Sequence, residues 1–339
     1  MKQIVTILLI VTSIPLFGFN FNKHKKEQDT TVVYYNDLSH RLLIKAGINS
    51  SFSNLSIINT RDNRELIIKP LGQVSLAAAV NYKWFGIGVG IGLPPNEKEK
   101  NKKGNTSKLD LQFNLYTKKF GGDVFFQKYN GFHLSNPGNT WKSDTLPQLG
   151  KMQQFAVGAT AFYIFNHNKF SYRAPYVRNT IQVKSAGSWL GGLFFNLDAA
   201  AVDGGFVPFD SLLINLRDSF PVYAYSSSSF GLSFGYSYTL VISPSFFFNA
   251  TLMPGFGLKN VSLETYKFEN GKVVTNAVST KSGAAGRVML RLSLGYEKNN
   301  FLIGATFHSS QGTIAIEHFE FKPGLGSFKF FIAKRFGQK

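Results

Sequence analysis

The sequence predicts an all-β fold: a transmembrane antiparallel up-and-down β-barrel of about 12 strands (about 12–14), with short periplasmic turns and long outer loops. Three features predict this class. Apolar and polar residues alternate over stretches of about ten residues. Short and long connections alternate along the chain, and aromatic residues gather at stretch ends beside the short connections.

The composition excludes several classes of site. The chain has 339 residues and no cysteine, so it has no disulfide framework, thiol nucleophile or thiolate metal site. It holds 34 Phe, 14 Tyr and 32 Gly, which favours closely packed β-strands. The formal net charge is +18. In an exported chain this charge favours an anionic membrane surface or anionic solutes as partners, and no nucleic acid.

The first residues have the pattern of an export signal. In "MKQIVTILLIVTSIPLFGFNF", Lys2 precedes an apolar run over residues 4–17 that is interrupted by Pro15 and is too short for a spanning helix. We expect a cleaved signal peptide over residues 1–19 and a periplasmic N-terminal extension over 20–40. A single outer-membrane barrel domain would cover 41–339.

Period-two alternation is clearest in four stretches. In "KLDLQFNLYTK", residues 108–118, Leu109, Leu111 and Phe113 share one face and polar residues share the other. "SFGLSFGYSYTL" and "RVMLRLSLGY" repeat the pattern, and "WFGIGVGIG" sets apolar residues against a glycine row. Strands of a soluble β-sandwich also alternate apolar and polar residues. The connections between strands are therefore needed to distinguish a sandwich from a membrane barrel.

The connections favour the barrel. Tight turns are expected near residues 81–84, 118–121, 166–169, 243–244 and 298–300, and long polar loops over 94–107, 130–150, 259–282 and 312–324. Aromatic pairs beside the turns, such as Tyr82 with Trp84, resemble an interfacial girdle. The C-terminal "SFKFFIAKRFGQK" resembles the terminal strand that the barrel assembly machinery recognises, although three residues follow Phe336.

Counting the alternating stretches gives the number of strands. Outward strands are expected near residues 42–53, 84–92, 120–130, 245–256 and 301–310. Returning strands are expected near 72–82, 108–118, 152–165, 228–241, 284–297 and 326–336. The segment 169–227 must make one net outward pass, for which "SWLGGLFFNLDAAA" is the candidate, giving about twelve strands; a further hairpin would give about fourteen.

Three blocks resemble a known family: "YKWFGIGVGIGLP", "DLQFNLYTKKFGGDVFFQKYNGFHLSNP" and "FSYRAP…KSAGSWLGG". With these blocks the chain resembles an uncharacterised outer-membrane β-barrel family of bacteroidetes, domain of unknown function 4421. The resemblance implies a barrel and an outer-membrane location. It implies no activity and no site residues.

One short motif resembles an active site. "GFHLSNPGN" holds His133, Ser135 and Asn136, like the local motif of outer-membrane phospholipases with their Ser nucleophile, His base and orienting Asn or acidic residue. A lipase pair must face the lipid, whereas the strand phase points His133 and Ser135 inward unless a bulge at Asn130 or Gly131 resets it. The alternative interpretation is an ordinary turn.

A second pair, His308 with Ser310, resembles the His-x-Ser pair of barrel lipid A deacylases, and its phase also points inward. The alternative is a polar rim. The six His residues show no metal-ligand spacing, and no phosphate loop or dinucleotide fingerprint occurs. We therefore expect no metal and no cofactor.

Charged residues on the predicted inward faces are mostly basic: Lys45, Lys108, Asp110, Lys118, Asp123, Lys128, Arg287, Arg291, Lys329 and Arg335. Charges inside a barrel must pair or meet water. One interpretation is a water-filled or partly occluded lumen that favours anions, with solute contacts at Arg287, Arg291, Lys45, Lys108, Asp110 and Asp123. The other is that Asp110 and Asp123 pair with Arg287 or Arg291 and that loop acids neutralise the rest.

Three functional hypotheses remain open at this stage. The first is a passive or gated channel for a small anionic solute. The second is a non-conducting structural or ligand-binding envelope barrel, and the third is an outer-membrane lipid hydrolase that uses a His-x-Ser pair. Expected partners are outer-membrane lipid, lipopolysaccharide and the barrel assembly machinery.

Overall fold

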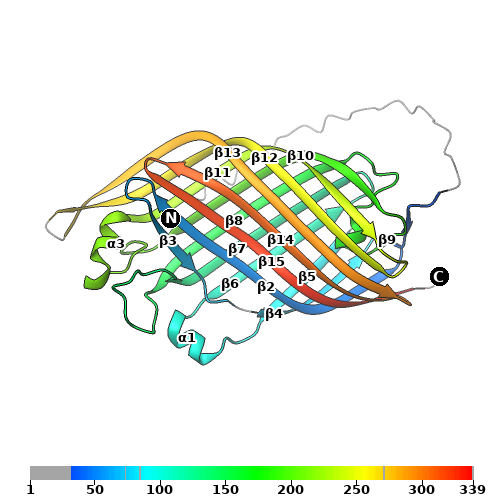
Figure 1. Ribbon diagram of the computed structural model, residues 1–339, viewed down its shortest axis with the longest axis horizontal. Helices are drawn as coiled ribbons and strands as arrows, with labels where there is room; N and C mark the ends of the chain where they lie inside the picture. Colours follow the sequence, from blue (N-terminus) through cyan, green and yellow to red (C-terminus); the bar gives the residue numbers. More distant parts are fainter. Residues whose placement is uncertain (1–31, 73, 84, 270–271, 338–339) are drawn as a thin grey trace. The chain divides into compact units, whose positions relative to one another are not determined.

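The fold is a closed ring of antiparallel strands (Figure 1). The computed structural model describes residues 32–72, 74–83, 85–269 and 272–337. The ring strands are β2 (Leu42–Asn59), β4 (Val74–Tyr82), β5 (Phe85–Gly92), β6 (Ser107–Tyr116), β7 (Phe120–Leu134), β8 (Gln148–Ile164), β10 (Ala186–Ala201), β11 (Val222–Val241), β12 (Phe246–Glu269), β13 (Lys272–Lys298), β14 (Phe301–Ile316) and β15 (Phe319–Phe336).

The remaining elements lie between the ring strands. They are β1 (Tyr35–Asp37), β3 (Arg64–Lys69), α1 (Glu97–Lys103), α2 (Arg173–Tyr176), β9 (Thr180–Gln182), the 3-10 helix η2 (Ser211–Leu213) and α3 (Ile214–Ser219).

Sequential strands pair around the ring, and β15 pairs with β2 to close it. The large sheet has 13 strands; β3 only bridges the ends of β2 and β7, which leaves twelve ring strands in the described part of the chain. The predicted all-β antiparallel up-and-down barrel of about twelve strands is confirmed. The segment 169–227 contributes the single pass β10, as predicted.

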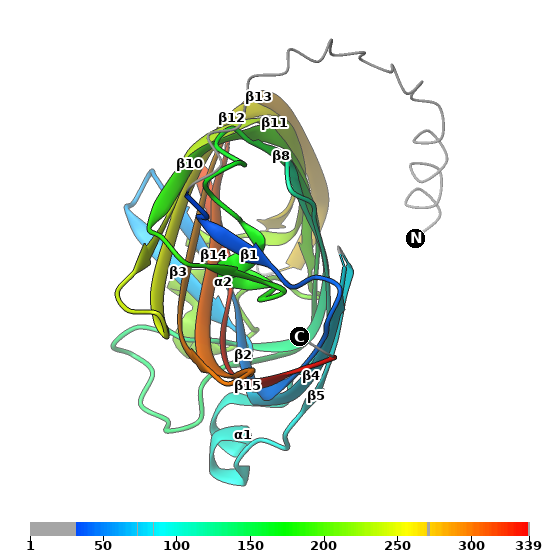
Figure 2. The same ribbon diagram turned by 90° about the vertical axis from the view of Figure 1, so that its right-hand side faces the viewer.

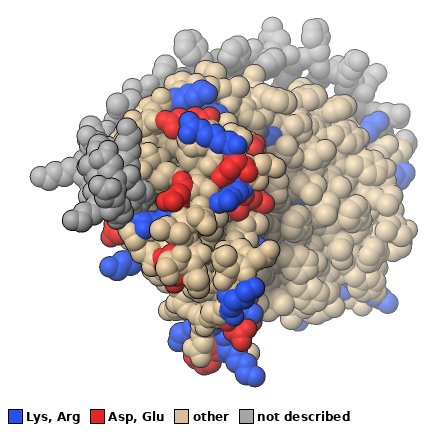
Figure 3. Space-filling model, turned by 60° about the vertical axis from the view of Figure 1, so that its left-hand side comes forward, with Lys and Arg blue, Asp and Glu red and all other residues tan. Residues whose placement is uncertain are grey.

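Alternation decides which side chains face outward. On β11, Phe230, Leu232 and Phe234 are exposed, whereas Ser233 and Ser237 are buried inside. Figure 3 shows charged side chains gathered over one end of the barrel, while the visible wall is nearly free of them. The ring therefore has an apolar outside and a polar inside, the arrangement of membrane-spanning barrels.

The two ends of the barrel differ. At the short-turn end, tight turns join β4 to β5, β6 to β7, β11 to β12 and β13 to β14. Asn299 and Asn300 have φ of 51° and 64°, the left-handed pair that a two-residue hairpin turn requires and that Asn tolerates. The opposite end, here called the long-loop end, carries α1, β3, α3 and residues 135–147.

Two predicted connections are wrong, and a third is longer than predicted. Residues 166–169 do form a tight turn, in which the Lys169 amide donates to the Asn166 carbonyl at 3.1 Å, but residues 170–185 follow this turn before β10 begins. The predicted loops 259–282 and 312–324 are mostly continuations of β12, β13, β14 and β15. Polar residues occupy both faces there because a strand that projects beyond the apolar belt meets water on both sides.

The predicted signal peptide and cleavage site lie outside the described residues. Of the predicted extension over residues 20–40, the described part contains β1, which pairs with β9 from Tyr35↔Gln182 to Asp37↔Thr180. No described helix is both long and apolar enough to cross a membrane.

Candidate functional site

Residues 165–185, together with β1, form a unit that we call the plug. Figure 2, which faces the short-turn end, shows β1 and α2 lying within the ring of strands. Phe170, Tyr172 and Val177 of the plug pack against side chains of the wall, including Phe162 and Met253, in one buried apolar cluster. The plug thus occupies the short-turn end of the lumen.

Polar contacts tie α2 to three wall strands, β2, β12 and β13. The Tyr176 hydroxyl donates to Asn249 Oδ1 at 2.6 Å, and Lys45 Nζ donates to the Tyr176 carbonyl at 3.0 Å. Ser293 Oγ donates to the Pro175 carbonyl at 2.7 Å. Burial raises the pKa of the Tyr176 hydroxyl well above its usual range, so this group remains a hydrogen-bond donor.

A buried ion-pair network fixes the end of the plug. Glu297 of β13 accepts from both Arg178 of the plug and Arg335 of β15. Arg178 also donates to the Ala174 carbonyl at 2.7 Å, and Arg335 donates to the Arg178 carbonyl at 2.7 Å. We call Arg178, Glu297 and Arg335 the latch.

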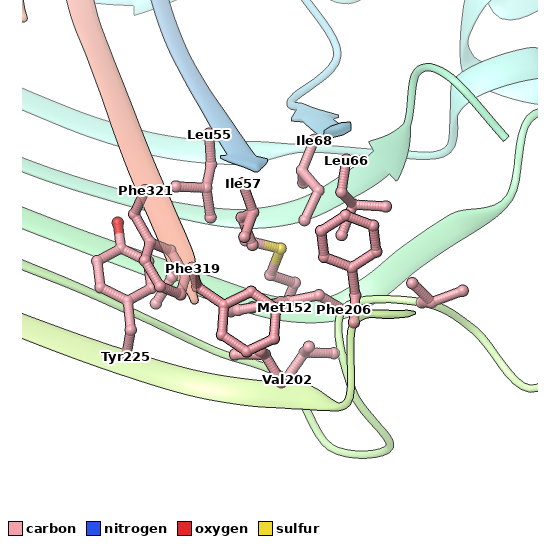
Figure 4. Close-up of a cluster of buried hydrophobic side chains, with 14 of the residues drawn as sticks. Leu55, Ile57, Leu66, Ile68, Met152, Val202, Phe206, Tyr225, Phe319 and Phe321 are labelled. Carbon is pink, nitrogen blue, oxygen red and sulfur yellow. The ribbon is translucent and has the colours of Figure 1, made fainter. Parts of the chain in front are cut away.

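The long-loop end is filled by a buried apolar cluster that we call the loop-end core. Figure 4 shows its side chains converging from several strands, with Ile57, Phe319 and Phe321 among them. Phe206 and Phe220, from the connection between β10 and β11, complete it and are fully buried. The loop-end core closes the lumen opposite the plug.

A polar chamber lies between the two closures. Its main cavity has a volume of about 300 Å³. Small side chains of β4 and glycines of β5 form one wall, and polar, aromatic and charged residues of other strands and of the plug form the rest. Its charged lining residues are Lys45, Lys108, Asp110, Arg291 and Lys329. A volume of this size is at the lower end of known small-molecule sites.

Arg291 is neutralised within the wall. Its guanidinium lies 2.8 Å from Asp123 Oδ2, and it donates to the Tyr116 hydroxyl at 2.8 Å. Asp123 also accepts from Asn114 at 2.7 Å. This is the pairing that the second interpretation of the lumen expects for Asp123.

Arg287 makes a different set of contacts. It donates to Thr160 Oγ1 at 2.9 Å and to Ser310 Oγ at 3.1 Å, and its guanidinium lies 5.4 Å from the ring centroid of Phe194. No ion pair joins it to a described carboxylate within 4.0 Å, although Asp198 lies near enough for Coulombic attraction. Arg287 and Asp198 line a smaller cavity toward the long-loop end.

With Arg291 paired to Asp123, three lysines, Lys45, Lys108 and Lys329, face one carboxylate, Asp110, on the lining of the main cavity. Lys329 donates to Gln112 Oε1 at 2.8 Å, and Lys45 donates to the Tyr176 carbonyl and lies 5.0 Å from the Phe331 ring centroid. Both acceptors are uncharged. The positive charges of Arg178, Lys329 and Arg335 also repel the Lys45 ammonium group. Asp110 is the carboxylate on this cavity's described lining.

The other predicted inward residues divide into two groups. Arg335 is buried in the latch. Lys118 and Lys128 are exposed, so their predicted inward positions are wrong. Lys118 lies in the turn between β6 and β7, and Lys128 follows the outward phase of Val124 and Phe126.

The His133 motif is not assembled as a catalytic triad. Gly131 has φ of 85° and the register slips between Asn130 and Phe132, so a bulge resets the strand phase. Phe132 joins the loop-end core, which places His133 on the other face, near the charges of Lys103 and Lys69. The inward position was predicted only for a strand without a bulge at Asn130 or Gly131, and that bulge is present.

Ser135 and Asn136 support β3 instead. The Ser135 amide donates to the Ile67 carbonyl at 2.8 Å. Asn136 Oδ1 accepts from the Ile67 amide at 2.7 Å, and Asn136 Nδ2 donates to the Glu65 carbonyl at 2.7 Å. Both polar atoms of the Asn136 amide thus bond to the β3 backbone.

His308 and Ser310 face the lumen, as their strand phase predicts. His308 lines the main cavity, while Ser310 accepts from Arg287. In the described part of the chain, no group of three or more His, Asp or Glu side chains could hold a metal ion. The sequence predicted an inward position for Arg335 of the latch but did not single out Arg178, Glu297 or Tyr176. The ambiguous period of residues 169–185 was the available signal.

Comparison with known proteins gives one family and several distant folds. Residues 27–336 match the family model described as "Domain of unknown function (DUF4421)". No curated protein matches the chain.

Solved structures that resemble the fold include the outer membrane protease OmpT of Escherichia coli, at 8% identity and a TM-score of 0.41, covering 89% of this chain and 98% of that one. The toluene transporter TodX of Pseudomonas putida has 7% identity and a TM-score of 0.27, and the match covers 87% of this chain and 89% of TodX. Ail of Yersinia pestis has 9% identity and a TM-score of 0.18, and the match covers 85% of this chain and 97% of Ail. At these scores the likenesses carry no information about a shared activity.

Proposed function

We propose that this protein is an outer-membrane β-barrel, closed at both ends at rest, that binds a small anionic group in its central chamber. The chain belongs to the family described as "Domain of unknown function (DUF4421)". Because that description names no activity, the proposal rests on the geometry of the chain itself. The short-turn end then faces the periplasm.

The outer wall supports the membrane location. Large apolar side chains are exposed in rows around the ring, for example Leu232, Phe256 and Leu258. Soluble monomers rarely expose a continuous apolar surface of this kind. A closed barrel also satisfies its backbone groups internally, as a lipid environment demands.

The charge of the main cavity carries the proposal. Lys45 and Lys329 lie in one cavity, hydrogen-bonded to uncharged acceptors, and Asp123 already neutralises Arg291. A lone buried charge is costly, and the cost falls when an opposite charge binds. A carboxylate or phosphate group would accept from both ammonium groups and relieve their mutual repulsion.

The closures favour a binding barrel over a passive pore. The plug occupies the short-turn end and the loop-end core fills the other, so ions meet packed side chains at both ends. A gated channel would need the plug to leave its latch.

The experiment measures butyrate binding to the detergent-solubilised barrel by calorimetry, using butyrate as a short carboxylate probe. We expect Lys45→Met and Lys329→Met each to weaken binding about tenfold or more, because a hydrogen bond to a charged group contributes about 1.5–3 kcal/mol. Lys128→Met, an exposed lysine on the outer wall, is the matched control and should bind like the wild type. No binding by the wild type, or equal losses in all three variants, would reject the chamber as an anion site.

A further inference from the structure

One seam of the barrel is largely unpaired. β5 and β6 pair only at Phe85↔Leu115 and Gly86↔Asn114. Their other edges are fully paired, from Ser75↔Gly92 on the β4 side and from Ser107↔Asn130 on the β7 side. The stretches 87–92 of β5 and 107–113 of β6 therefore face each other without a hydrogen-bonded ladder. We call this the seam.

The seam lies within the apolar belt of the wall. Val89 and Ile91 of β5 are 67% and 77% exposed, and Leu109 and Leu111 of β6 are also exposed on the same outer surface. Unpaired backbone groups facing hydrocarbon cost several kcal/mol each and are tolerated where they line a polar cavity. The open edges of β5 and β6 thus require such a cavity behind them.

The main cavity of the chamber is that cavity. Gly86, Gly88 and Gly90 of β5 line it on one side of the seam, and Asp110 and Gln112 of β6 line it on the other. Gly90 leaves space, because a Cβ there would lie 3.7 Å from its nearest neighbours, whereas a Cβ at Gly86 would meet the Asn81 side chain at 2.3 Å. The seam therefore joins the charged chamber to the apolar outer surface.

We propose that the seam is a lateral portal through which a single-chain anionic amphiphile, a fatty acid, enters from the bilayer. This inference rests on the proposed function and names its ligand class. The carboxylate lies in the chamber beside Lys45 and Lys329. The alkyl chain passes between β5 and β6 and remains against the outer apolar rows.

Three properties of the structure converge on this ligand. Both ends are closed, so the seam is the opening left in the described barrel wall. The chamber has an excess of positive charge, which selects an anionic head. The outer rows beside the seam are apolar, which suits a chain that stays in lipid.

The test uses photolabelling of the full barrel in lipid nanodiscs. Lauric acid with a diazirine on its chain is compared with its neutral methyl ester, and labelled peptides are mapped by mass spectrometry. We expect the acid to label the outer rows of β5 and β6 several-fold more than other wall strands, and the ester to label all walls evenly. Lys45→Met and Gly90→Leu should each remove the excess.

Gly286→Leu is the matched control for Gly90→Leu, because a Cβ at Gly286 of β13 meets nothing within 4 Å. It should leave the labelling pattern unchanged, and circular dichroism checks that each variant keeps its strand content. Even labelling by the acid, or an excess that survives Gly90→Leu, would overturn the portal. If Lys45-dependent butyrate binding persists in that case, only the portal fails; if butyrate does not bind, the proposed function fails as well.

Discussion

Replacing Glu297 with Gln should release the plug. The Glu297 carboxylate accepts from Arg178 and Arg335, whose side chains are 3% and 2% exposed, and is itself 9% exposed. The amide keeps the shape but loses the charge. The amide oxygen can still accept from one guanidinium group, but the amide NH2 group faces the other, and neither arginine keeps a carboxylate partner. The carbonyls of Ala174 and Arg178 and the Phe247 ring remain as uncharged partners.

The magnitude follows from the burial. Removing one partner of a buried ion pair costs about 3–5 kcal/mol, because the other charge is left uncompensated. With two arginines affected, the upper end of that range applies. A loss at this upper end raises the population of the released plug by about three to four powers of ten.

Limited trypsin digestion in nanodiscs measures that population. Arg173 and Arg178 are buried, so cleavage after them requires the plug to open. We expect Glu297→Gln to be cut at these sites far faster than the wild type. Glu320→Gln is the control, because its pair with Lys322 at 3.6 Å is a surface contact worth about 0–1 kcal/mol. Equal cleavage of Glu297→Gln and the wild type would refute the latch.

Three further substitutions test other parts of the barrel. Asp123→Asn should lower the unfolding free energy by about 3–5 kcal/mol in denaturant titrations, because it leaves Arg291 without its ion-pair partner. The double variant Asp123→Leu with Arg291→Met should recover part of this loss; no recovery would mean that packing, not charge, causes the loss. Phe206→Ala should lower the unfolding free energy by about 3–5 kcal/mol, because it opens a cavity in the loop-end core. A decrease below about 1 kcal/mol would show that the surrounding side chains repack into the cavity. Asn136→Ala should lower the unfolding free energy by about 1–3 kcal/mol, because it removes two hydrogen bonds to β3, and Ser135→Ala should lower it less. A larger loss for Ser135→Ala would indicate a role for the Ser135 hydroxyl.

The sequence predicts the wall better than the interior. Period-two alternation places Lys45, Asp110, Arg287 and Arg291 toward the lumen, because the pleat of a regular strand allows no other phase. At His133 the phase depends on a bulge: Gly131 adopts φ of 85° and shifts the register. The sequence marks Asn130 and Gly131 as places where a bulge can form, but alternation alone does not decide whether it forms.

The plug and latch could not be predicted, for a physical reason. Residues 165–185 have neither strand nor helix periodicity, and their conformation depends on partners far along the chain. Arg178 meets Glu297 at a separation of 119 residues, and Tyr176 meets Asn249 at a separation of 73. Composition shows an excess of positive charge but not where it is buried.

Single-channel recording in a planar bilayer tests the central claim most directly. A barrel closed by the plug and the loop-end core should show no steady conductance across a KCl gradient. Glu297→Gln should also show none, because the loop-end core still fills the end opposite the plug. Steady conductance of the wild type would contradict the closed barrel and support a passive channel.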